Sequence, residues 1–503
     1  MDTQLSPGTF SEFEQHARRA GVVAITRTVS STSFNVLDAF MTIGNAKRYA
    51  FLFESVEGEE RVAQYSFVGA DPYMIVRGNG NQTVLEREDG LETLQMPASD
   101  YLKQHFRQRT LAEQVDQVPL MGGAVGYLGY NAAQWFEPAA KSAEGTCDDA
   151  VFMVCRSLVV FDHRRNRVRL VSVVFPEEAD QDRRKLRQLY QDAVKQTQEL
   201  YDALNERPSS VSGRQAVENS EHEWRSNWSK SDFEDAVNRV KEHILAGDCY
   251  QVVLSQRFSR HVTATPIAIY RALRKTNPAP YMYFLKLDSD SIIGASPEML
   301  VRCRGGRIEY RPIAGTRPRG ATDEEDQRLT EEMKADSKEI AEHMMLVDLG
   351  RNDVGRVAAF GSLRIDELMT VERYSKVQHL VSSLSAQLRA NCDRFDALAA
   401  CFPAGTVTGA PKVKAMQIIR ELEPEPRSVY AGAIFYADYA GNLDSCIAIR
   451  TIELRNGQAS VQAGAGIVAD SIPEREYAET VAKAEALRRA IEIAEESEVT
   501  LIR

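Results

Sequence analysis

The chain of 503 residues lacks several features that would place it in a common class of protein. It has no run of about 18 apolar residues that could form a membrane-spanning helix, and its first residues contain no apolar signal-peptide core. Acidic residues (72) outnumber Lys and Arg (61), so the net charge of −11 argues against nucleic-acid binding, which needs a basic face. We therefore expect a cytoplasmic protein that binds neither membrane nor nucleic acid.

Cysteine motifs and nucleotide-binding loops are also missing. The seven cysteines stand singly, without a Cys-x-x-Cys pair, which is typical of reduced thiols and not of a zinc site or a disulfide framework. None lies in a Gly-x-Cys-x-Gly elbow, so the sequence has no glutaminase nucleophile motif. The glycine-rich segments 121–130 and 405–412 lack the spacing of a dinucleotide-binding loop and of a phosphate-binding loop.

What the sequence does contain predicts a large α+β protein. Hydrophobic residues make up 43% and charged residues 26%, as in globular proteins with a sizeable core. Short β-rich segments dominate the first half and include a predicted hairpin of strands 151–161 and 167–175, followed by a helix over 177–204. The Ser-, Asn- and charge-rich stretch 207–230 predicts a linker between an N-terminal half (1–206) and a C-terminal half (231–503).

One long amphipathic helix is predicted over residues 332–355. Glu339 and Glu342 are three residues apart and would share one face of it, where paired carboxylates could hold a hard divalent cation. Taken alone, this pair is more simply explained as a solvated acidic face beside Lys334 and Lys338.

A second acidic pair lies near the end of the chain. A helix is predicted over residues 473–496, with Glu476 and Glu479 again three apart and Lys483 four residues further on. Two such pairs on two helices could close on one cation from opposite sides, although periodicity alone does not fix that geometry.

Seven motifs between about 230 and 485 occur in the order found in one known family. Together they resemble the large subunit of anthranilate synthase, a chorismate-using enzyme of tryptophan biosynthesis, and the N-terminal half matches more weakly through Phe51–Ser55 and Tyr65–Gly69. The resemblance implies a chorismate-binding fold with two large antiparallel sheets packed in a core and helices outside. The motifs are Ala246–Ser255, Ala295–Leu300, Arg311–Arg317, Lys338–His343, Asp348–Asp353, Pro403–Lys412 and Ala463–Ile467.

The resemblance also implies a two-stage reaction and a magnesium ion. Ammonia adds at C2 of chorismate as the C4 hydroxyl leaves, and pyruvate is then eliminated. By resemblance Glu342 and Glu479 bind Mg²⁺ directly, whereas Glu339 and Glu476 bind through waters. This fits the preference of Mg²⁺ for a few carboxylates, retained waters and an anionic substrate.

Three residues receive catalytic roles from the resemblance. Glu298 is the general acid that protonates the leaving hydroxyl, His379 assists the elimination, and Thr316 orients the reacting groups. Each also has a plainer explanation: a carboxylate paired with an arginine, a satisfied core histidine and an ordinary turn hydroxyl.

The resemblance also implies a set of substrate-binding residues. Arg450 and Lys483 are the cationic partners for the substrate carboxylates, and arginine suits bidentate binding of that group. The remaining residues of the implied substrate site are Gln251, Gly315, Thr406, Tyr430, Gly464, Ala465 and Gly466.

Two positions separate this chain from relatives with other products. Isochorismate-forming enzymes carry a lysine where Gln251 stands, and aminodeoxychorismate synthases typically carry one where Ala314 stands. Lysine there could activate or act as a nucleophile at C2, and alanine cannot. Aminodeoxychorismate synthase remains the nearest alternative enzyme, and a non-catalytic amino-acid-sensing subunit is the alternative from another class.

The resemblance finally implies a partner and an inhibitor. Because the chain has no glutaminase motif, a separate glutamine amidotransferase subunit would supply ammonia, in a heterotetramer of two large and two small subunits. Feedback tryptophan would bind two segments, with Glu54 pairing with its amino group. The departure from the family pattern at Val62-Ala63-Gln64 leaves the strength of inhibition open. The residues implied for the tryptophan site are Glu54, Ser55, Pro280, Tyr281 and Met282.

Overall fold

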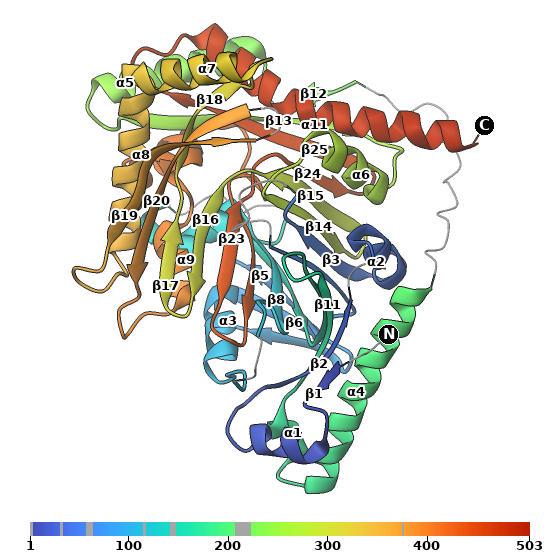
Figure 1. The fold of residues 1–503 in the computed structure, drawn as a ribbon. Helices are drawn as coiled ribbons and strands as arrows, with labels where there is room; N and C mark the ends of the chain where they lie inside the picture. The colour runs from blue at the N-terminus through green and yellow to red at the C-terminus, as the bar shows by residue number, and fades with distance from the viewer. Residues whose placement is uncertain are drawn as a thin grey trace.

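Two large antiparallel sheets organise the molecule (Figure 1). The computed structural model describes residues 4–30, 34–56, 64–113, 117–140, 147–206, 223–374 and 377–502. Within these ranges one sheet has 13 strands, and we call it the first sheet. In spatial order its strands are β1 (Gln4–Ser6), β2 (Val23–Ser30), β11 (Arg167–Val174), β10 (Ser157–Asp162), β4 (Tyr65–Ala70), β3 (Tyr49–Glu54), β14 (Tyr281–Leu287), β15 (Asp290–Ser296), β24 (Thr451–Arg455), β25 (Gln458–Ile467), β13 (Gln251–His261) and β12 (Arg225–Ser226), with β21 (Gly409–Ala410) also pairing with β13.

The second sheet has 12 strands in the described residues. The strand β19 (Arg364–Arg373) pairs with β20 and lies off the main path. Along that path the strands are β18 (Ile313–Pro318), β20 (Val377–Gln387), β17 (Arg307–Tyr310), β16 (Met299–Arg304), β23 (Leu443–Ile447), β22 (Ala433–Asp438), β8 (Gly123–Leu128), β9 (Ala150–Cys155), β5 (Met74–Asn79), β6 (Gln82–Arg87) and β7 (Gly90–Leu94).

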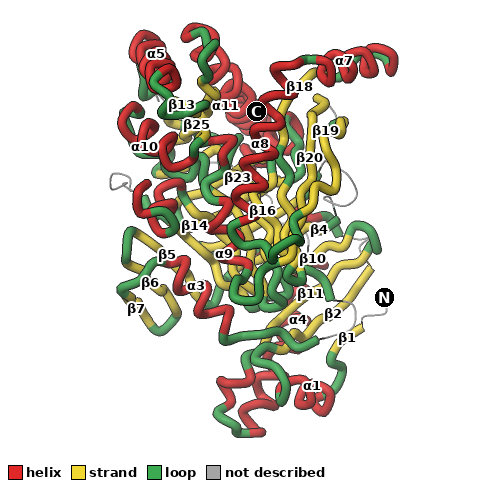
Figure 2. The backbone as a smooth tube through the Cα atoms, turned by 90° about the vertical axis from the view of Figure 1, so that its left-hand side faces the viewer, coloured by secondary structure: helices red, strands yellow, loops and turns green. Residues whose placement is uncertain are grey.

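Helices cover the outside of the strand layers (Figures 1 and 2). Several begin at side-chain caps, which satisfy the free amides of the first turn: Thr9, Asn35, Ser229 and Asp393 each accept such a bond. The α-helices are α1 (Phe10–Ala17), α2 (Val36–Ile43), α3 (Ala98–Arg107), α4 (Arg183–Asn205), α5 (Lys230–Leu245), α6 (Pro266–Thr276), α7 (Asp323–Ala335), α8 (Ser337–Gly355), α9 (Arg394–Cys401), α10 (Lys412–Leu422) and α11 (Pro473–Ile502).

Strand alternation supplies two separate cores. In β3, Phe51 belongs to the core between the sheets, together with Phe152 and Phe435 of the second sheet. Its neighbour Leu52 packs on the opposite face, in a core that the outer helices cover. Because successive side chains of a strand point to opposite faces, one strand can serve both cores. The fold is therefore the predicted α+β fold, with two large antiparallel sheets and helices outside.

The two halves named from the sequence contribute strands to both sheets. In the first sheet β3 pairs with β14, placing Phe53 opposite Tyr283, and in the second sheet β8 pairs with β22. The boundary near residue 207 therefore does not separate one sheet from the other. Residues 207–222 of the predicted linker lie outside the described residues, whereas Arg225–Ser226 forms β12 at the edge of the first sheet.

Two of the predicted elements were wrong. The strand predicted over 151–161 is two strands in different sheets, because the chain crosses from β9 to β10 at Arg156. The helix predicted over 332–355 is also two helices. It breaks at Asp336, whose carboxylate accepts bonds from the amides of Lys338 and Glu339 and so begins α8. Because both helices keep apolar residues on the inner side, the hydrophobic pattern continues across the break and does not reveal it.

Candidate active site

A cavity of about 910 Å³ lies where α8, α11 and the ends of both sheets meet. Its walls come from β13 and β25 of the first sheet, from β18 and β20 of the second, and from the two helices that carry the acidic pairs. Twelve of the sixteen predicted catalytic, substrate and metal residues line it. They are Glu298, His379, Gln251, Thr406, Tyr430, Arg450, Gly464, Gly466, Lys483, Glu342, Glu476 and Glu479.

Glu298 is a buried acid at the point where the chain passes from β15 in the first sheet to β16 in the second. Its backbone is fixed, because its carbonyl accepts a bond from the Ile447 amide at 3.1 Å. Burial raises the pKa of the Glu298 carboxyl to about 8, and the nearby hydroxyl of Thr406 opposes that rise. The side chain is therefore mostly protonated at neutral pH, as a general acid must be.

His379 is held by the neighbouring strand. Its Nδ1 lies 3.2 Å from the carbonyl oxygen of Gly315, which can only accept, so Nδ1 carries the proton and Nε2 keeps its lone pair. Burial lowers the pKa of the imidazole, which favours the neutral form. Thr316 pairs with His379 across β18 and β20, and its side chain lies outside the described part of the chain.

Gly315 lies beside the cavity in a position that needs glycine. Its φ of +61° falls in the left-handed region, and a Cβ there would lie 3.1 Å from an oxygen of Glu339. Glu339 itself accepts a bond from the Arg317 guanidinium at 2.8 Å. Gly315 thus gives β18 room to approach the first acidic pair.

Three of the four carboxylates line the cavity, Glu342 from α8 and Glu476 and Glu479 from α11, whereas Glu339 lies beside it next to Gly315. Burial, followed by the nearby charge of Glu339, raises the pKa of Glu342, and Glu479 adds to the effect. Burial also raises the pKa of Glu476. Among the described residues no three His, Cys, Asp or Glu side chains form a ready-made metal cluster. The four carboxylates nevertheless offer only hard oxygen donors, the type that Mg²⁺ prefers.

The two cationic side chains predicted to bind the substrate line the same cavity. Lys483 binds the Glu479 carboxylate at 2.7 Å and the Gly464 carbonyl at 3.0 Å. Arg450 opens into the cavity, and within the described ranges no carboxylate lies at ion-pair distance from it. Burial alone lowers the pKa of this guanidinium, so an anionic ligand would compensate a charge that the protein leaves unpaired.

Alternation along β25 separates the three predicted residues of the Gly-Ala-Gly motif. Gly464 and Gly466 line the cavity, whereas Ala465 packs on the other face in the core with α5. A side chain at Gly464 would meet the Tyr430 hydroxyl, and one at Gly466 would clash with the Gln251 amide. Glycine at these two positions lets the neighbouring polar side chains reach the cavity.

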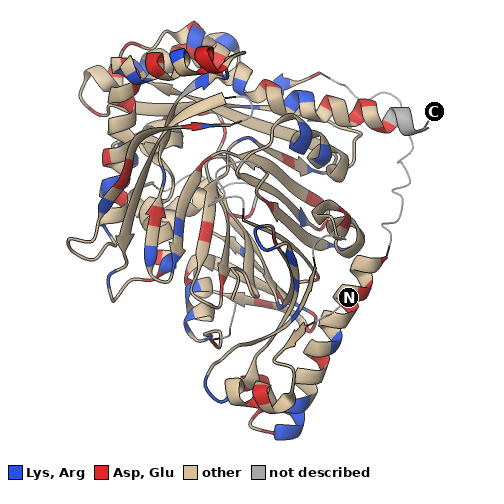
Figure 3. Ribbon diagram, in the orientation of Figure 1, with Lys and Arg blue, Asp and Glu red and all other residues tan. Residues whose placement is uncertain are grey.

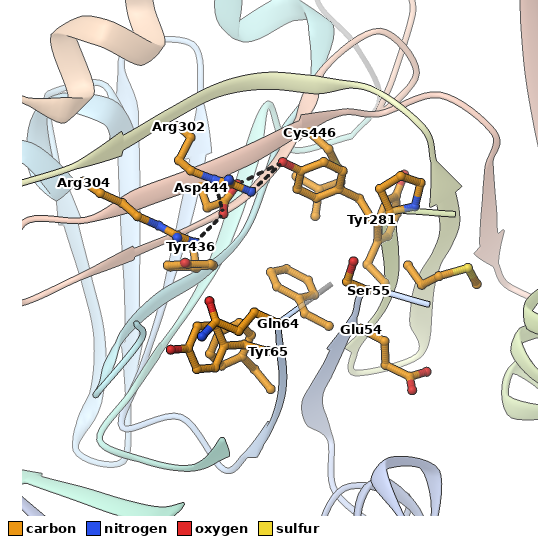
Figure 4. Close-up of a pocket in the computed structure, with 16 residues that line it drawn as sticks. Glu54, Ser55, Gln64, Tyr65, Tyr281, Arg302, Arg304, Tyr436, Asp444 and Cys446 are labelled. Atoms are coloured by element: carbon orange, nitrogen blue, oxygen red, sulfur yellow. Dashed lines mark hydrogen bonds and ion pairs between the residues drawn. The ribbon is translucent and has the colours of Figure 1, made fainter. Parts of the chain in front are cut away.

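A smaller cavity, of about 60 Å³, brings together the two segments predicted to bind tryptophan (Figure 4). Ser55, Pro280, Tyr281 and Met282 line it, and the Ser55 hydroxyl is buried with no hydrogen-bond partner among the described residues. The Glu54 carboxylate points away from the cluster, because alternation sends it to the opposite face of β3, where it accepts bonds from Tyr270 and Arg274. Residues 57–63, including Val62 and Ala63, lie outside the described residues.

Sequence reasoning missed the charged group at the other end of this small cavity. Asp444 accepts bonds from Arg302 at 2.8 Å, Arg304 at 3.2 Å and the Tyr281 hydroxyl at 3.2 Å. Two arginines alternating within the buried strand β16 were the available signal, since a charge inside such a strand needs a partner. In the large cavity the reasoning missed Lys338 and Gln462 as lining residues.

Charged residues of both signs are mixed over the outer helices (Figure 3). In the part of the chain that the structure describes, no helix is long and apolar enough to cross a membrane.

Comparisons with known proteins agree with this site. The family described as chorismate binding enzyme matches residues 48–489. The chain therefore belongs to the chorismate-binding enzyme family.

Several curated relatives share one name. Anthranilate synthase component 1 of Aquifex aeolicus is 43% identical over 92% of this chain and 93% of its own length. The protein of the same name from Pseudomonas putida is 43% identical over 89% and 91%. The crystal structure of anthranilate synthase component I from Streptococcus pneumoniae superposes with a TM-score of 0.75 at 36% identity, covering 85% of this chain and 92% of that one. The resemblance that the motifs predicted is confirmed.

We predict that Glu298 makes stability depend on pH. Its pKa is higher in the folded chain, so the folded state holds a proton that the unfolded state releases above about 4.5, the ordinary value. Relative to Glu298→Gln, the wild type should lose stability as pH rises from about 4.5 to 8 and level off above that. Urea unfolding of both proteins across this range measures the difference, and a difference that stays constant with pH would contradict the assignment.

Proposed function

We propose that this protein is the large subunit of an anthranilate synthase, which converts chorismate and ammonia to anthranilate and pyruvate in tryptophan biosynthesis. The observation that carries the proposal is one cavity lined by a protonated acid, Glu298, by the guanidinium of Arg450, which has no carboxylate partner among the described residues, and by three carboxylates of the two acidic pairs. Chorismate is a dicarboxylate with a hydroxyl leaving group, so it needs both an anion partner and an acid.

The first stage replaces the hydroxyl by an amino group. The ammonia nitrogen forms a bond to C2, the ring double bonds shift, and the C4–O bond breaks. Glu298 gives its proton to the departing oxygen, which leaves as water, while the new ammonium group loses a proton. The raised pKa of Glu298 keeps that proton available at neutral pH.

The second stage forms the aromatic ring. The proton at C2 is removed, the bond between C3 and the enolpyruvyl oxygen breaks, and the enolate takes up a proton to become pyruvate. The Nε2 lone pair of His379 is a candidate to accept a proton here, because Nδ1–H is already committed to the Gly315 carbonyl. Arg450 and the glycine positions of β25 would hold the substrate during both stages.

Magnesium fits the donor set. Glu342 and Glu479 would hold the ion, and Glu339 and Glu476 would bind its waters. When bound, Mg²⁺ offsets the charge of the ring carboxylate, which would otherwise face a group of like charges. Mg²⁺ commonly uses one or two carboxylates together with substrate oxygens, which agrees with a site that has no preassembled three-residue cluster among the described residues.

Two residues of the cavity wall indicate the nucleophile and the product. Gln251 and Ala314 line the cavity where related enzymes of other specificity have lysine. Neither side chain can activate water or attack C2 covalently, which favours ammonia as the nucleophile. We propose that a glutamine amidotransferase subunit supplies it, in a heterotetramer of two large and two small subunits.

Feedback inhibition by tryptophan is supported by the small cavity. The Ser55 hydroxyl, which can donate and accept, has no hydrogen-bond partner within the described ranges, and Pro280 lines both this cavity and the large one. A ligand that shifts the Pro280 segment would therefore alter the wall of the chorismate cavity. Glu54 is engaged with Arg274, so Ser55 is the better residue for testing this site.

The function is tested by incubating the purified protein with chorismate, MgCl₂ and ammonium chloride. Anthranilate should accumulate and be detected by its fluorescence, with an equal amount of pyruvate. No product, or 4-amino-4-deoxychorismate in place of anthranilate, would reject the proposal.

Replacing Glu342 by Gln should lower kcat at least about 100-fold, because one direct ligand of the ion is lost. The concentration of Mg²⁺ that gives half-maximal rate should rise as well. Glu485→Gln, on the exposed side of α11, is the matched control and should behave as wild type. An unchanged Mg²⁺ dependence in Glu342→Gln would remove it from the metal site.

Ser55→Ala should weaken tryptophan inhibition by about tenfold, the cost of one buried hydrogen bond, without changing the uninhibited rate. Ser157→Ala, in β10 of the same sheet, provides the control because its hydroxyl bonds Ser172 outside the small cavity. Titration of tryptophan into the anthranilate assay measures the effect. Equal inhibition of wild type and Ser55→Ala would exclude this site.

A further inference from the structure

A buried ion pair lies directly behind the wall of the large cavity, and no step described above uses it. Arg427 and Glu423 are four residues apart after α10, and their side chains are only 1% and 4% exposed. Two charges removed this far from water are costly unless each finds several partners. Outside the pair itself, the hydrogen-bond partners that they find all belong to segments that line the cavity.

The guanidinium of Arg427 joins two of these segments. Nε and Nη2 bind the two oxygens of Glu423, at 2.9 and 2.6 Å. Nη1 donates to the Val407 carbonyl at 2.8 Å and Nη2 to the Val253 carbonyl at 2.7 Å. Val407 closes the short helical turn Gly405–Val407 that carries Thr406, and Val253 lies on β13 next to the cavity. One rigid planar group thus sets the spacing between the turn and the strand.

The same guanidinium also supports an aromatic wall residue. Its central carbon lies 5.4 Å from the ring centre of Tyr430 and 4.8 Å from that of Tyr130, both within cation–π range. Tyr430 lines the cavity, where it meets Gly464 of β25. Arg427 does not line the cavity itself. It contacts the ring of Tyr430 and binds the turn that carries Thr406, and both of these residues are predicted to bind the substrate.

Glu423 extends the network to a third wall residue. Its Oε1 accepts bonds from the amide and the hydroxyl of Ser255, each at 2.8 Å. The single hydroxyl proton of Ser255 is used in that bond, so Ser255 Oγ must accept from the Gln462 Nε2, 2.9 Å away. This fixes which way the Gln462 amide faces. Its Oε1 is buried without a partner among the described residues, and Gln462 lines the cavity.

We propose that the Arg427–Glu423 pair is a positioning element of the chorismate cavity, which holds Thr406, Tyr430 and Gln462 in the geometry that binds the substrate. The proposal rests on the proposed function only for its turnover readout, because substrate binding is measured separately. If the pair served folding alone, its other hydrogen bonds could end on any buried segment. Instead, each hydrogen bond outside the pair ends on a segment of the cavity wall.

The test compares Arg427→Met with Arg427→Lys and with a matched control. Isothermal titration of chorismate with MgCl₂ gives Kd, and thermal unfolding gives Tm. Arg427→Met should raise Kd at least about tenfold, because it loosens two walls and leaves Glu423 buried without its partner. Arg427→Lys, which keeps the charge but not the planar fork, should give an intermediate Kd.

Arg260→Met is the control. Arg260 is similarly buried, pairs with Glu495 and stacks on Trp224, but it contacts no residue of the cavity wall through these groups. Its loss should lower Tm by a similar amount and leave Kd within about twofold of wild type. If both methionine variants lower Tm and neither changes Kd, the Arg427–Glu423 pair is structural only and the proposal is overturned.

Ser255→Ala keeps the test decisive if Arg427→Met does not fold. It removes the link to Gln462 while leaving the ion pair, and it should raise Kd about two- to fivefold; an unchanged Kd together with unchanged kcat/KM would also overturn the proposal. A wild-type protein that binds chorismate but forms no anthranilate would reject the proposed function and leave this comparison of Kd values intact.

Discussion

Removal of charge from water is the constraint on which this site depends. Burial keeps Glu298 protonated and His379 neutral, and it leaves Arg450 with a charge that the described protein groups do not compensate. None of these states is a property of the side chain alone. Each arises because the two sheets meet at this point and exclude solvent.

Buried ion pairs connect the segments that surround this point. Lys412 binds Asp353 at 2.8 Å and so ties the start of α10 to the end of α8. Arg427 and Glu423 then tie the end of α10 to the turn before it and to β13. Breaking such a pair by moving one wall would leave an uncompensated buried charge, which is costly. The cavity is thus built from many short segments that buried ion pairs connect.

Local sequence patterns predicted part of the site but did not predict a helix break and several side-chain pairings. The spacing of Glu476 and Glu479 placed both on the cavity side of α11, as observed, whereas of Glu339 and Glu342 only Glu342 lines the cavity. It could not show that Asp336 would begin a new helix, because capping depends on a single side-chain bond. Nor could it show that Glu54 turns toward Arg274, since that depends on which face of β3 the next helix covers. Arg302 and Asp444, far apart in sequence, were missed for the same reason.

The sequence by itself determined the family, the α+β character and twelve of the residues that line the cavity, because the motifs fix residue types at set spacings and strand alternation follows from the backbone. Only the tertiary structure decided which of those residues share a surface. It turned Ala465 away from Gly464 and Gly466, paired Glu339 with Arg317 and left Arg450 without a carboxylate partner in the part of the chain that the structure describes. It also brought residues 338–346 of α8 opposite residues 476–487 of α11. The physical reason is that pKa and pairing depend on distance and solvent exclusion between segments, and neither is encoded in the spacing of residues along the chain.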